Sequence, residues 1–519
     1  MHHTTMTTGT DPGTGVVYTE QRVACIMVRE AMRSRLAIHF SGSENQIDQF
    51  MNGSMDTDRA QTWLQTVRAF SFLDPAVGEG IFIREYIHCL KNLHRLYQVW
   101  QPDDWIPDNL TGFEIDETVP NRAGSCPWQE KIRYEDYLLS PVPPVDIIVG
   151  NPPYIRQELI DRTYKDHIFR LVQNQWPELT LNKRMDMYAY FLFKALADLK
   201  PGGVCTFIIP NTWLDSDYGA AIRHLVSTGL ELVAITDSRH RHFAVDVNTV
   251  IVTFRRRKPG SSILLRVDRS EHELPVRILR QLDLPWSGWI FRCPDWVRQL
   301  LDGDQFQPLD SLFHIKTGII TGNNARYYSE KNDRGEPALK SPREVKSILW
   351  EKEQARYYVQ NDHIPYTMKK APLLWPDLRG SRHVVVWNRD NLAFEHTFYG
   401  LEPLVGEEKK WALLLNSTWV WLMVEIFGRH NLGGGAIRLV KSGLRTLPLP
   451  IFAHGALPEG VDTMLTRPIG NGDQELSQPD RRRLDRWILR SLGQEKYLDQ
   501  LYADTSRLMS YRIKKAARS

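Results

Sequence analysis

The stretch that decides the fold runs Val145-Asp146-Ile147-Ile148-Val149-Gly150-Asn151-Pro152-Pro153-Tyr154. Its apolar first half is typical of a buried strand, which two prolines end because proline cannot donate to a sheet ladder. The prolines also stiffen the loop and leave carbonyl acceptors without neighbouring N–H groups. Asn151 adds a side-chain carbonyl and Tyr154 an aromatic ring. Acceptors beside a ring suit the binding of a planar amine, although a Pro-Pro turn after a core strand has the same sequence.

A second predicted strand, residues 70–73, ends at Asp74 and is followed by a turn containing Gly78 and Gly80 and by a helical pattern from Ile81. Strand, glycine turn and helix form the first unit of a nucleotide-binding α/β domain. The turn carries a carboxylate and lacks a Gly-Lys-Ser/Thr ending. It therefore favours a cationic ligand over a phosphate.

Two further acids precede the Asn-Pro-Pro-Tyr loop. Glu114 ends the short run Thr111-Gly112-Phe113, at the position where such domains hold a ribose diol, although the same carboxylate could cap the following helix. Asp136 lies in Tyr134-Glu135-Asp136-Tyr137, just before the strand that leads to Asn151.

The first half of the chain alternates strands and helices, which predicts one doubly wound sheet. Thr19 is a candidate N-cap of an amphipathic helix with Val23, Ile26, Met27 and Ala31 on one face. Residues 41–60 are predicted to be a surface excursion and residues 155–185 a mobile loop beside the site. The remaining predicted elements are a helix at 186–199 and strands at 204–209, 232–236 and 249–254.

The composition changes after Pro259. Residues 282–296 are rich in Pro and Trp, and an irregular region of aromatic, basic and turn residues then runs to Pro450. It includes the segments Lys316-Thr317-Gly318 to Asn324 and Gly433-Gly434-Gly435. This region predicts a separate β-rich domain, whereas the apolar spacing from Asp480 onward predicts helices.

Composition limits the class of protein. The chain has 519 residues, enough for two or three domains, and a net charge of +3, too small to indicate a nucleic-acid partner by itself. Its apolar runs are shorter than a membrane span and the start of the chain is polar, so we expect a cytoplasmic protein that does not contact membrane. The 5 cysteines form no C-x-x-C pair, so we expect free thiols and no metal site.

Taken together, Gly-Val-Val-Tyr-Thr (15–19), Asp-Pro-Ala-Val-Gly-Glu-Gly (74–80), Gly-Phe-Glu-Ile-Asp (112–116), Glu-Asp-Tyr (135–137) and Asn-Pro-Pro-Tyr (151–154) occur in the order typical of one family. The chain resembles the gamma class of N6-adenine DNA methyltransferases of restriction-modification systems. The resemblance implies an α/β fold with a doubly wound Rossmann-like sheet in an S-adenosylmethionine-binding catalytic domain (1–260). It also implies a β-rich target-recognition domain that binds DNA (261–450) and a C-terminal helical segment (451–519).

The same resemblance implies roles for individual residues. The methionine end of S-adenosylmethionine would be lined by Tyr18, Thr19, Asp74, Ala76 and Gly78. Glu114 would bind the ribose, and Asp136 with Tyr137 the adenine ring of the cofactor. The catalytic group would be Asn151, Pro152 and Tyr154, and the target-base pocket Tyr154, Phe207 and Phe254, the last two at the ends of their strands.

The chemistry accounts for these residue types. A sulfonium cofactor is cationic and should be surrounded by acids. The N6 lone pair of adenine is delocalised into the ring, and hydrogen bonds from N6–H to Asn151 and the Pro152 carbonyl would draw the nitrogen toward a reactive geometry. A flipped base would stack on Tyr154. We therefore expect an adenine-specific enzyme that acts as a monomer on double-stranded DNA, with a separate cognate restriction endonuclease as a compatible partner.

Other functions fit the same loop. Asn-Pro-Pro-Tyr also resembles the loops of methyltransferases that modify protein glutamine or exocyclic amines of RNA, and cytosine N4 is a chemically adjacent target. A catalytically inactive DNA-binding relative is a further alternative. The long C-terminal half favours DNA reading. Pro376-Asp377 with Glu407-Glu408-Lys409 loosely matches a nuclease pattern, but such matches arise by chance, so we expect methylation without cleavage.

Overall fold

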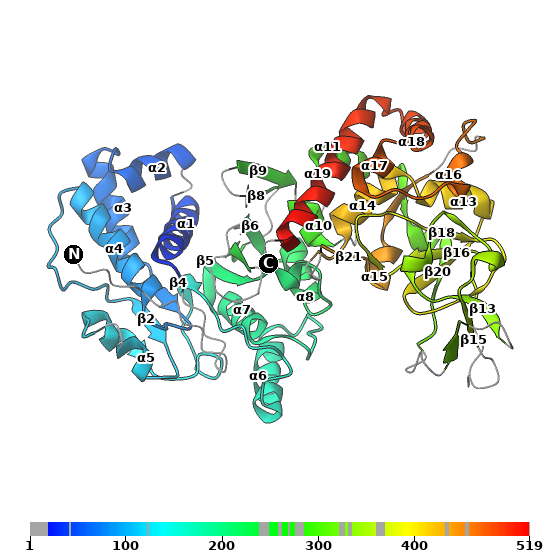
Figure 1. Cartoon of the computed structure of the whole chain (residues 1–519). Coiled ribbons are helices and arrows are strands. Elements are labelled where there is room, and N and C mark those ends of the chain that lie inside the picture. The colour runs from blue at the N-terminus through cyan, green and yellow to red at the C-terminus, as the bar shows by residue number, and fades with distance from the viewer. Residues whose placement is uncertain are drawn as a thin grey trace, which may run out of the picture. The chain divides into compact units, whose positions relative to one another are not determined.

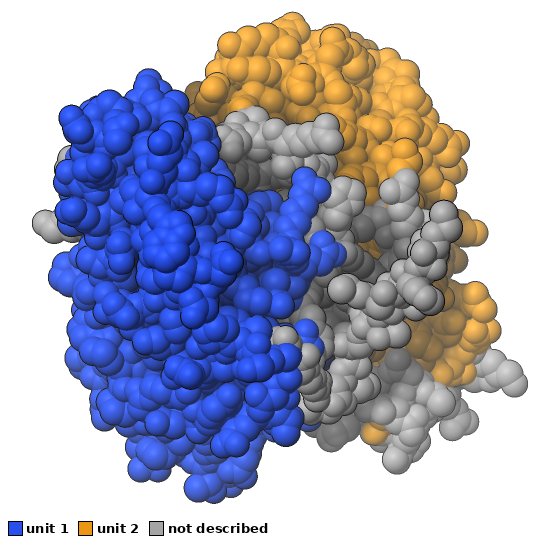
Figure 2. Space-filling model, turned by 90° about the vertical axis from the view of Figure 1, so that its left-hand side faces the viewer, with its two compact units in different colours: residues 1–281 blue, residues 282–519 orange. Residues whose placement is uncertain are grey.

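The computed structural model forms two compact units, Met1–Gln281 and Leu282–Ser519, shown in blue and orange in Figure 2. The structure describes residues 19–40, 43–121, 124–237, 249–257, 262–267, 270–275, 285–320, 327–330, 335–359, 369–430, 435–451 and 456–517. Tyr18, most of the glycine run at 433–435 and residues 321–324 lie outside the described residues. The first unit extends past residue 260, and the division into three functional domains remains a prediction.

The first unit is built on a nine-stranded sheet of order β3-β2-β1-β4-β5-β7-β6-β8-β9. The strands β3, β2, β1, β4 and β5 are parallel, whereas β7 is antiparallel to both β5 and β6. The predicted α/β fold is therefore confirmed, and the structure shows that its sheet is mixed (Figure 1). The strands are β1 (Phe72–Asp74), β2 (Leu110–Phe113), β3 (Ile132–Arg133), β4 (Val145–Gly150), β5 (Leu199–Pro210), β6 (Glu231–Asp237), β7 (Thr249–Arg255), β8 (Ser262–Val267) and β9 (Ser270–Pro275).

Strand order reverses between β1 and β4, because β1 pairs with β2 on one side and with β4 on the other. In open α/β sheets, such a switch point leaves a crevice at the carboxyl ends of the strands, where ligands bind. Asp74 ends β1 and Asn151 follows β4, so the two groups emphasised by the sequence lie on either side of this crevice.

Helix α1 (Gln21–His39) packs along the sheet through buried Val23, Met27 and Ala31, as the sequence predicted. Two details of that prediction are wrong. Ile26 is 49% exposed, because it lies on the exposed face of the helix. The N-cap is Glu20 and not Thr19, because the helix begins at Gln21.

Two predicted loops are helical. Residues 41–60 contain α2 (Glu44–Asn52) and the start of α3 (Thr57–Ala69), and their polar residues include N-caps, because Ser43 accepts from the Gln46 N–H and Asp56 from the Arg59 N–H. The segment 155–185 contains α6 (Arg162–Gln175), capped by Asp161. The other helices of this unit are α4 (Ile81–Leu96), α5 (Thr118–Asn121), the 3₁₀ helices η1 (Pro127–Lys131) and η2 (Asn211–Leu214), α7 (Met187–Ala197) and α8 (Ala220–Thr228).

The second unit combines small sheets with helices. A five-stranded sheet has the order β11-β20-β16-β18-β14 and a four-stranded sheet the order β12-β15-β13-β19, so the predicted strands are present. The strands are β10 (Phe306–Pro308), β11 (Phe313–Thr317), β12 (Tyr328–Ser329), β13 (Glu336–Leu339), β14 (Leu349–Trp350), β15 (Tyr357–Val359), β16 (Leu373–Pro376), β17 (Leu378–Arg379), β18 (Val386–Asn388), β19 (Ala393–Phe394), β20 (Phe398–Pro403), β21 (Ile437–Arg438) and β22 (Pro448–Pro450).

Helices also contribute to the core of this unit, which the irregular composition did not reveal. The apolar helix α14 packs against α19, the last helix of the chain. The helices are α10 (Trp286–Phe291), α11 (Asp295–Leu301), α13 (Glu408–Leu415), α14 (Thr418–Phe427), α15 (Lys441–Arg445), α16 (Thr463–Thr466), α17 (Gly472–Leu476), α18 (Pro479–Ser491) and α19 (Leu498–Ala517). The short 3₁₀ helices are η3 (Leu309–Ser311), η4 (Pro342–Glu344), η5 (Lys352–Gln354) and η7 (Glu495–Tyr497).

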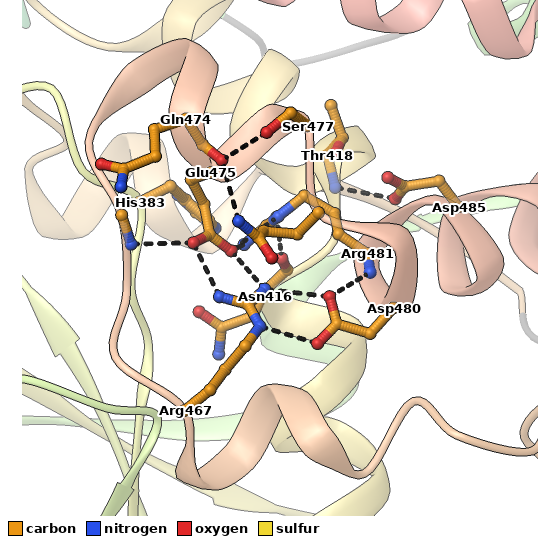
Figure 3. A network of polar contacts seen from close by, with 12 residues as sticks. His383, Asn416, Thr418, Arg467, Gln474, Glu475, Ser477, Asp480, Arg481 and Asp485 are labelled. Atoms are coloured by element: carbon orange, nitrogen blue, oxygen red, sulfur yellow. Dashed lines mark hydrogen bonds and ion pairs between the residues drawn. The ribbon is translucent and has the colours of Figure 1, made fainter.

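Buried charges connect the helices of the second unit, and Figure 3 shows the main network. The Arg481 and Glu475 side chains are both 0% exposed and lie 2.8 Å apart, between Nη2 and Oε1. Arg467 donates to both Glu475 and Asp480, and Arg481 also donates to the Asn416 carbonyl. Each of these charges therefore has a partner of opposite sign.

Candidate active site

The candidate site lies at the carboxyl ends of β1, β2 and β4. A Cβ atom added to Gly150 would lie 3.0 Å from Pro75 Cδ and 3.2 Å from Asp74 Oδ1. Glycine at position 150 therefore lets the end of β4 approach the turn after β1. The close approach brings Asn151 to the same edge as Asp74.

Asp74 is 0% exposed. Its Oδ1 accepts from the Ala76 N–H at 3.2 Å, whereas its Oδ2 is buried and has no hydrogen-bond partner among the described residues. Burial raises the pKa of this carboxyl to about 8, and the charge of Glu114 adds to the rise. A buried acceptor of this kind fits a cationic ligand, whose charge would offset the cost of ionising the carboxyl.

The glycine turn after β1 leaves room beside Asp74. Gly78 has φ +53°, and a Cβ added there would meet no atom within 4 Å, so the backbone is open on that side. Gly80 has φ +79°, and a Cβ there would lie 2.3 Å from the Trp128 ring. Gly78 thus leaves the backbone open, and Gly80 lets the start of α4 approach Trp128 of η1.

Glu114 is held by backbone donors. Its Oε2 accepts from the Gly78 N–H at 2.9 Å, and its Oε1 accepts from the N–H groups of Ile115 and Asp116 at 2.9 and 3.1 Å. These donors precede α5, and the Thr118 N–H at the start of that helix donates to Asp116 instead, so the structure does not support the capping alternative for Glu114. The carboxylate joins the turn after β1 to the end of β2, and its ribose role remains a prediction.

Ile115 is a candidate that the sequence reasoning missed. It follows Glu114 and is 69% exposed. A large apolar side chain exposed next to a polar site offers a face on which a planar ring can rest. The available signal was its position, one residue beyond the acid that ends β2.

Asp136 and Tyr137 face different surroundings. Asp136 Oδ1 accepts from the Leu138 N–H at 2.9 Å and Oδ2 from the Tyr164 hydroxyl of α6 at 2.7 Å. Tyr137 is 1% exposed, and its hydroxyl donates to Asp198 at 2.8 Å. The Tyr137 side chain is therefore part of the core, which does not favour its predicted contact with an adenine ring.

The Asn-Pro-Pro-Tyr loop is held from two sides. Asn151 Nδ2 donates to Thr19 Oγ1 at 3.1 Å, and the Tyr154 hydroxyl donates to the Ile208 carbonyl on β5 at 2.9 Å. Burial raises the pKa of Tyr154 well above its usual value, so the hydroxyl stays protonated and donates. Pro152, between these two anchors, is buried.

The continuation of this loop is fixed to the start of α7. The Met187 N–H donates to the Ile155 carbonyl, and the Gln157 N–H donates to Asp186 Oδ1, each at 2.9 Å. The other oxygen of Asp186 accepts from the Tyr218 hydroxyl at 3.3 Å. These backbone anchors and α6 give regular structure to part of the segment 155–185, which the sequence predicted to be a mobile loop.

The two predicted pocket aromatics occupy different positions in the sheet. Phe207 on β5 pairs with Gly150, next to Asn151, and is buried. Phe254 pairs with Cys205, which is level with Ile148 inside the sheet, and its ring packs against Trp213. Because β7 is antiparallel, its end points away from the site edge. Phe254 is near the end of β7, as expected, but that end lies away from Asn151, so this geometry does not favour the predicted contact with the target base.

Four further observations concern other predictions. The described residues contain no cluster of three His, Cys, Asp or Glu side chains that could hold a metal ion. None of the five cysteines forms a disulfide bond. Asp377, in the loose nuclease pattern, accepts from Arg438 through both oxygens, at 3.1 and 2.9 Å from Nε. Among the described helices, none has the length and apolar character needed to cross a membrane.

Comparisons with known proteins agree with this architecture. A family model described as Eco57I restriction-modification methylase matches residues 120–243. The Type II methyltransferase M.XhoI of Xanthomonas vasicola is 30% identical over 515 residues, covering 81% of this chain and 91% of that protein. M.TthHB8I of Thermus thermophilus is 27% identical over 253 residues, so the match spans about half of each protein, 47% of this chain and 52% of the relative.

A solved structure is also similar. The Type IIL restriction-modification enzyme MmeI in complex with DNA has a TM-score of 0.57 at 13% identity, covering 95% of this chain and 79% of that one. At this identity the likeness concerns the fold. The fold and the matched segment define the class as a methyltransferase of the restriction-modification type. The similarity to M.XhoI over most of both sequences shows that the chain belongs to the Type II methyltransferase family.

Proposed function

We propose that this protein transfers a methyl group from S-adenosylmethionine to N6 of an adenine flipped out of duplex DNA, at a specific site. One observation carries the proposal: the Asn151 carboxamide, anchored by Thr19, and the buried Asp74 carboxyl border the same switch-point crevice. The first group can accept hydrogen bonds from a target amine, and the second can balance a cation. Both are needed for methyl transfer from a sulfonium to an amine.

The residues present fit the cofactor. Asp74 Oδ2 is a buried acceptor, and the backbone of Gly78 is open, so the methionine end would lie against these residues and Ala76. Glu114 would bind the ribose and Asp136 the adenine amine, with Ile115 against the ring. When bound, S-adenosylmethionine supplies an electrophilic methyl group. The charge of its sulfonium is the reason for acids and an open backbone at this edge.

The target base would be held by the loop after β4. Asn151 Oδ1 and the Pro152 carbonyl would accept the two N6–H hydrogen bonds and so localise the nitrogen lone pair. The Tyr154 ring would stack on the base, and base–aromatic stacking of this kind is worth about 1–3 kcal/mol per base. Phe207, level with Gly150, would close the pocket from the β5 side. No covalent nucleophile is required.

Site recognition would belong to the second unit. Its small sheets, irregular connections and basic residues suit the reading of base edges, and the similar MmeI structure is described as a complex with DNA. The Lys316-Thr317-Gly318 segment begins the region that we assign to base reading. The protein would act as a monomer, with a separate cognate endonuclease as a partner in the same restriction-modification system.

The decisive experiment follows the methyl group. Duplex DNA is incubated with labelled S-adenosylmethionine and the protein, and the nucleosides are analysed by mass spectrometry. We expect N6-methyladenine. N4-methylcytosine would change the target base, and label found only in RNA or protein would overturn the proposal.

Asn151→Ala tests the mechanism within the same assay. It removes one of two acceptors that act in the transition state, a loss of roughly 10²–10³ in single-turnover rate, while affinity for S-adenosylmethionine persists. Asn174→Ala, at an exposed position on α6, is the matched control and should methylate at the native rate. A native rate for Asn151→Ala would show that the loop is only a turn.

A further inference from the structure

The hydrogen bond between Asn151 and Thr19 joins residues 132 positions apart in the chain. The sequence resemblance places Thr19 at the methionine end of the cofactor, yet its hydroxyl oxygen accepts from Asn151 Nδ2 at 3.1 Å. We infer that Thr19 is a positioning residue: it holds the amide nitrogen of Asn151 and thereby turns the amide oxygen toward the target amine. The inference rests on the proposed function and deepens it.

The need for such a residue follows from the shape of a carboxamide. Its oxygen and NH₂ ends have nearly the same size, so a half-turn about the last side-chain bond exchanges an acceptor for a donor at little steric cost. A target amine is itself a donor and is bound only by the oxygen end. The Thr19 hydroxyl fixes the position of the carboxamide, and in the arrangement of the structure, with Nδ2 on Thr19 Oγ1, the oxygen end is left for the target amine.

Thr19 is held in place by contacts that do not involve a cofactor. It lies just before α1, and the Glu20 carbonyl accepts from the N–H groups of Val23 and Ala24 at 3.0 and 3.1 Å. Near the other end of α1, Arg35 Nη2 donates to Asp146 Oδ1 at 2.8 Å. Asp146 lies near the start of β4, and Asn151 follows the end of β4. The helix is therefore fixed to both ends of the strand that carries the loop.

Two substitutions separate the positioning role from a cofactor-binding role. Thr19→Val keeps the shape of the side chain and removes the acceptor, whereas Thr19→Ser keeps the hydroxyl. We expect Thr19→Val to lower the single-turnover methylation rate roughly 3- to 10-fold, the effect of one neutral hydrogen bond. At the same time, the Kd for S-adenosylmethionine, measured by calorimetry, should stay within about twofold, because the lost contact is to Asn151. Thr19→Ser should stay near the native rate.

Two results would overturn the inference. One is a native single-turnover rate for Thr19→Val. The other is a rate that recovers fully at saturating cofactor together with a weakened Kd, which would assign Thr19 to cofactor binding alone. Thermal unfolding of both variants shows whether the fold is intact.

A double-mutant cycle tests the orientation argument directly. In an Asn151→Asp background both terminal oxygens are acceptors, so no orientation has to be selected. Thr19→Val should then change the rate by less than twofold relative to Asn151→Asp alone. An equal loss in both backgrounds would indicate a general structural role and contradict the inference. If Asn151→Asp is too slow to measure, the Val and Ser rates decide alone.

The same experiments distinguish this inference from the proposed function. The rates are measured on whichever nucleoside carries the label. If that product is N4-methylcytosine, the proposed target is wrong, but the Thr19 dependence still applies because the acceptor is also an exocyclic amine. If the product is N6-methyladenine and Thr19→Val is native, the proposed function stands and only the inference fails.

Discussion

Buried charges serve opposite purposes in the two units. In the second unit, Arg481, Glu475, Arg467 and Asp480 are bound to one another, so the desolvation cost of each charge is offset by a partner (Figure 3). In the first unit, Asp74 is as deeply buried, but one of its oxygens has no hydrogen-bond partner among the described residues. The difference indicates that a paired buried charge stabilises the fold, whereas the unpaired Asp74 carboxyl, whose pKa is raised to about 8, is the group available to the proposed cationic ligand.

Arg379 in the second unit is a buried charge that belongs to neither case. None of its guanidinium nitrogens has a hydrogen-bond partner among the described residues. The guanidinium lies 4.0 Å from the centre of the Trp375 ring, and burial lowers its pKa to about 9. A cation over an aromatic face is partly compensated, so Arg379 is intermediate between the paired network and Asp74.

The largest expected effect comes from breaking the network. Glu475→Ala would leave Arg467 and Arg481 without the carboxylate that both contact. Removing one partner of a fully buried ion pair costs about 3–5 kcal/mol, so the free energy of unfolding should fall by that amount. Denaturant unfolding measures it. Glu495→Ala, in an exposed pair with Arg490, is the control and should change the free energy of unfolding far less, because water screens an exposed pair. Equal effects for the two variants would contradict the comparison.

The second prediction uses pH to test the open carboxyl. The pKa of Asp74 is raised to about 8, so the folded state retains a proton that an unfolded chain loses near the ordinary pKa of 3.8. The contribution of Asp74 to stability therefore decreases as pH rises from about 4 to about 8 and is constant above that range. If only the ionised form binds a cation, affinity for S-adenosylmethionine should rise up to about tenfold per pH unit below pH 8.

Calorimetric titration between pH 6 and pH 9 measures this dependence. Asp74→Asn is the matched control, because it cannot ionise; its affinity should be lower and independent of pH in this range. A native affinity that does not change with pH would show that Asp74 does not meet the cationic group.

The third prediction concerns Glu114. Glu114→Ala should weaken S-adenosylmethionine binding roughly tenfold or more, because hydrogen bonds to a charged group are each worth about 1.5–3 kcal/mol. The substitution also releases the N–H groups of Gly78, Ile115 and Asp116, so part of the loss would come from a looser turn. Glu114→Gln keeps an acceptor for the backbone. Titration of both variants with the cofactor, and with a 2′-deoxyribose analogue, separates the ribose contact from the turn.

The smallest expected effect is that of the Tyr154 hydroxyl. Tyr154→Phe keeps the stacking ring and removes the hydrogen bond to the Ile208 carbonyl, so the single-turnover rate should fall only about 2- to 10-fold. Tyr154→Ala should fall further, because it also removes the ring. A fluorescent base analogue at the target position reports flipping separately from chemistry. If Tyr154→Phe is as inactive as Tyr154→Ala, stacking is not the main role of this residue.

The sequence predicted those parts of the site that lie where a strand ends. Asp74, the glycine turn and the Asn-Pro-Pro-Tyr loop end or follow strands whose apolar runs are short and clear, and a parallel sheet brings such ends to one edge. The sequence did not predict that Glu114 would be held by three backbone amides. Those donors belong partly to another turn, and contacts between distant segments leave no local pattern.

Other predictions were wrong because they also depended on tertiary structure that leaves no local pattern. Polar residues at 41–60 were interpreted as a surface loop, but Ser43 and Asp56 are helix caps, which have the same composition as turns. The sequence predicted that Phe254 lies at the end of a strand beside the target base. It does not reveal the direction of that strand, and because β7 is antiparallel to β5, its end lies away from Asn151. Tyr137 was grouped with Asp136 because the two are neighbours in the sequence. Their side chains point in different directions, and the Tyr137 ring lies in the core.

The attachment of α1 to both ends of β4 limits which changes in chain length the protein can accept. Inserting one residue between Cys25 and Arg35 would rotate the two ends of the helix by about 100° and lengthen it by about 1.5 Å. Either Thr19 would lose Asn151, or Arg35 would lose Asp146. The exposed face of α1, including Ile26, can therefore vary in residue type but not in residue number. Deletions and insertions in this helix should be selected against even where substitutions are neutral.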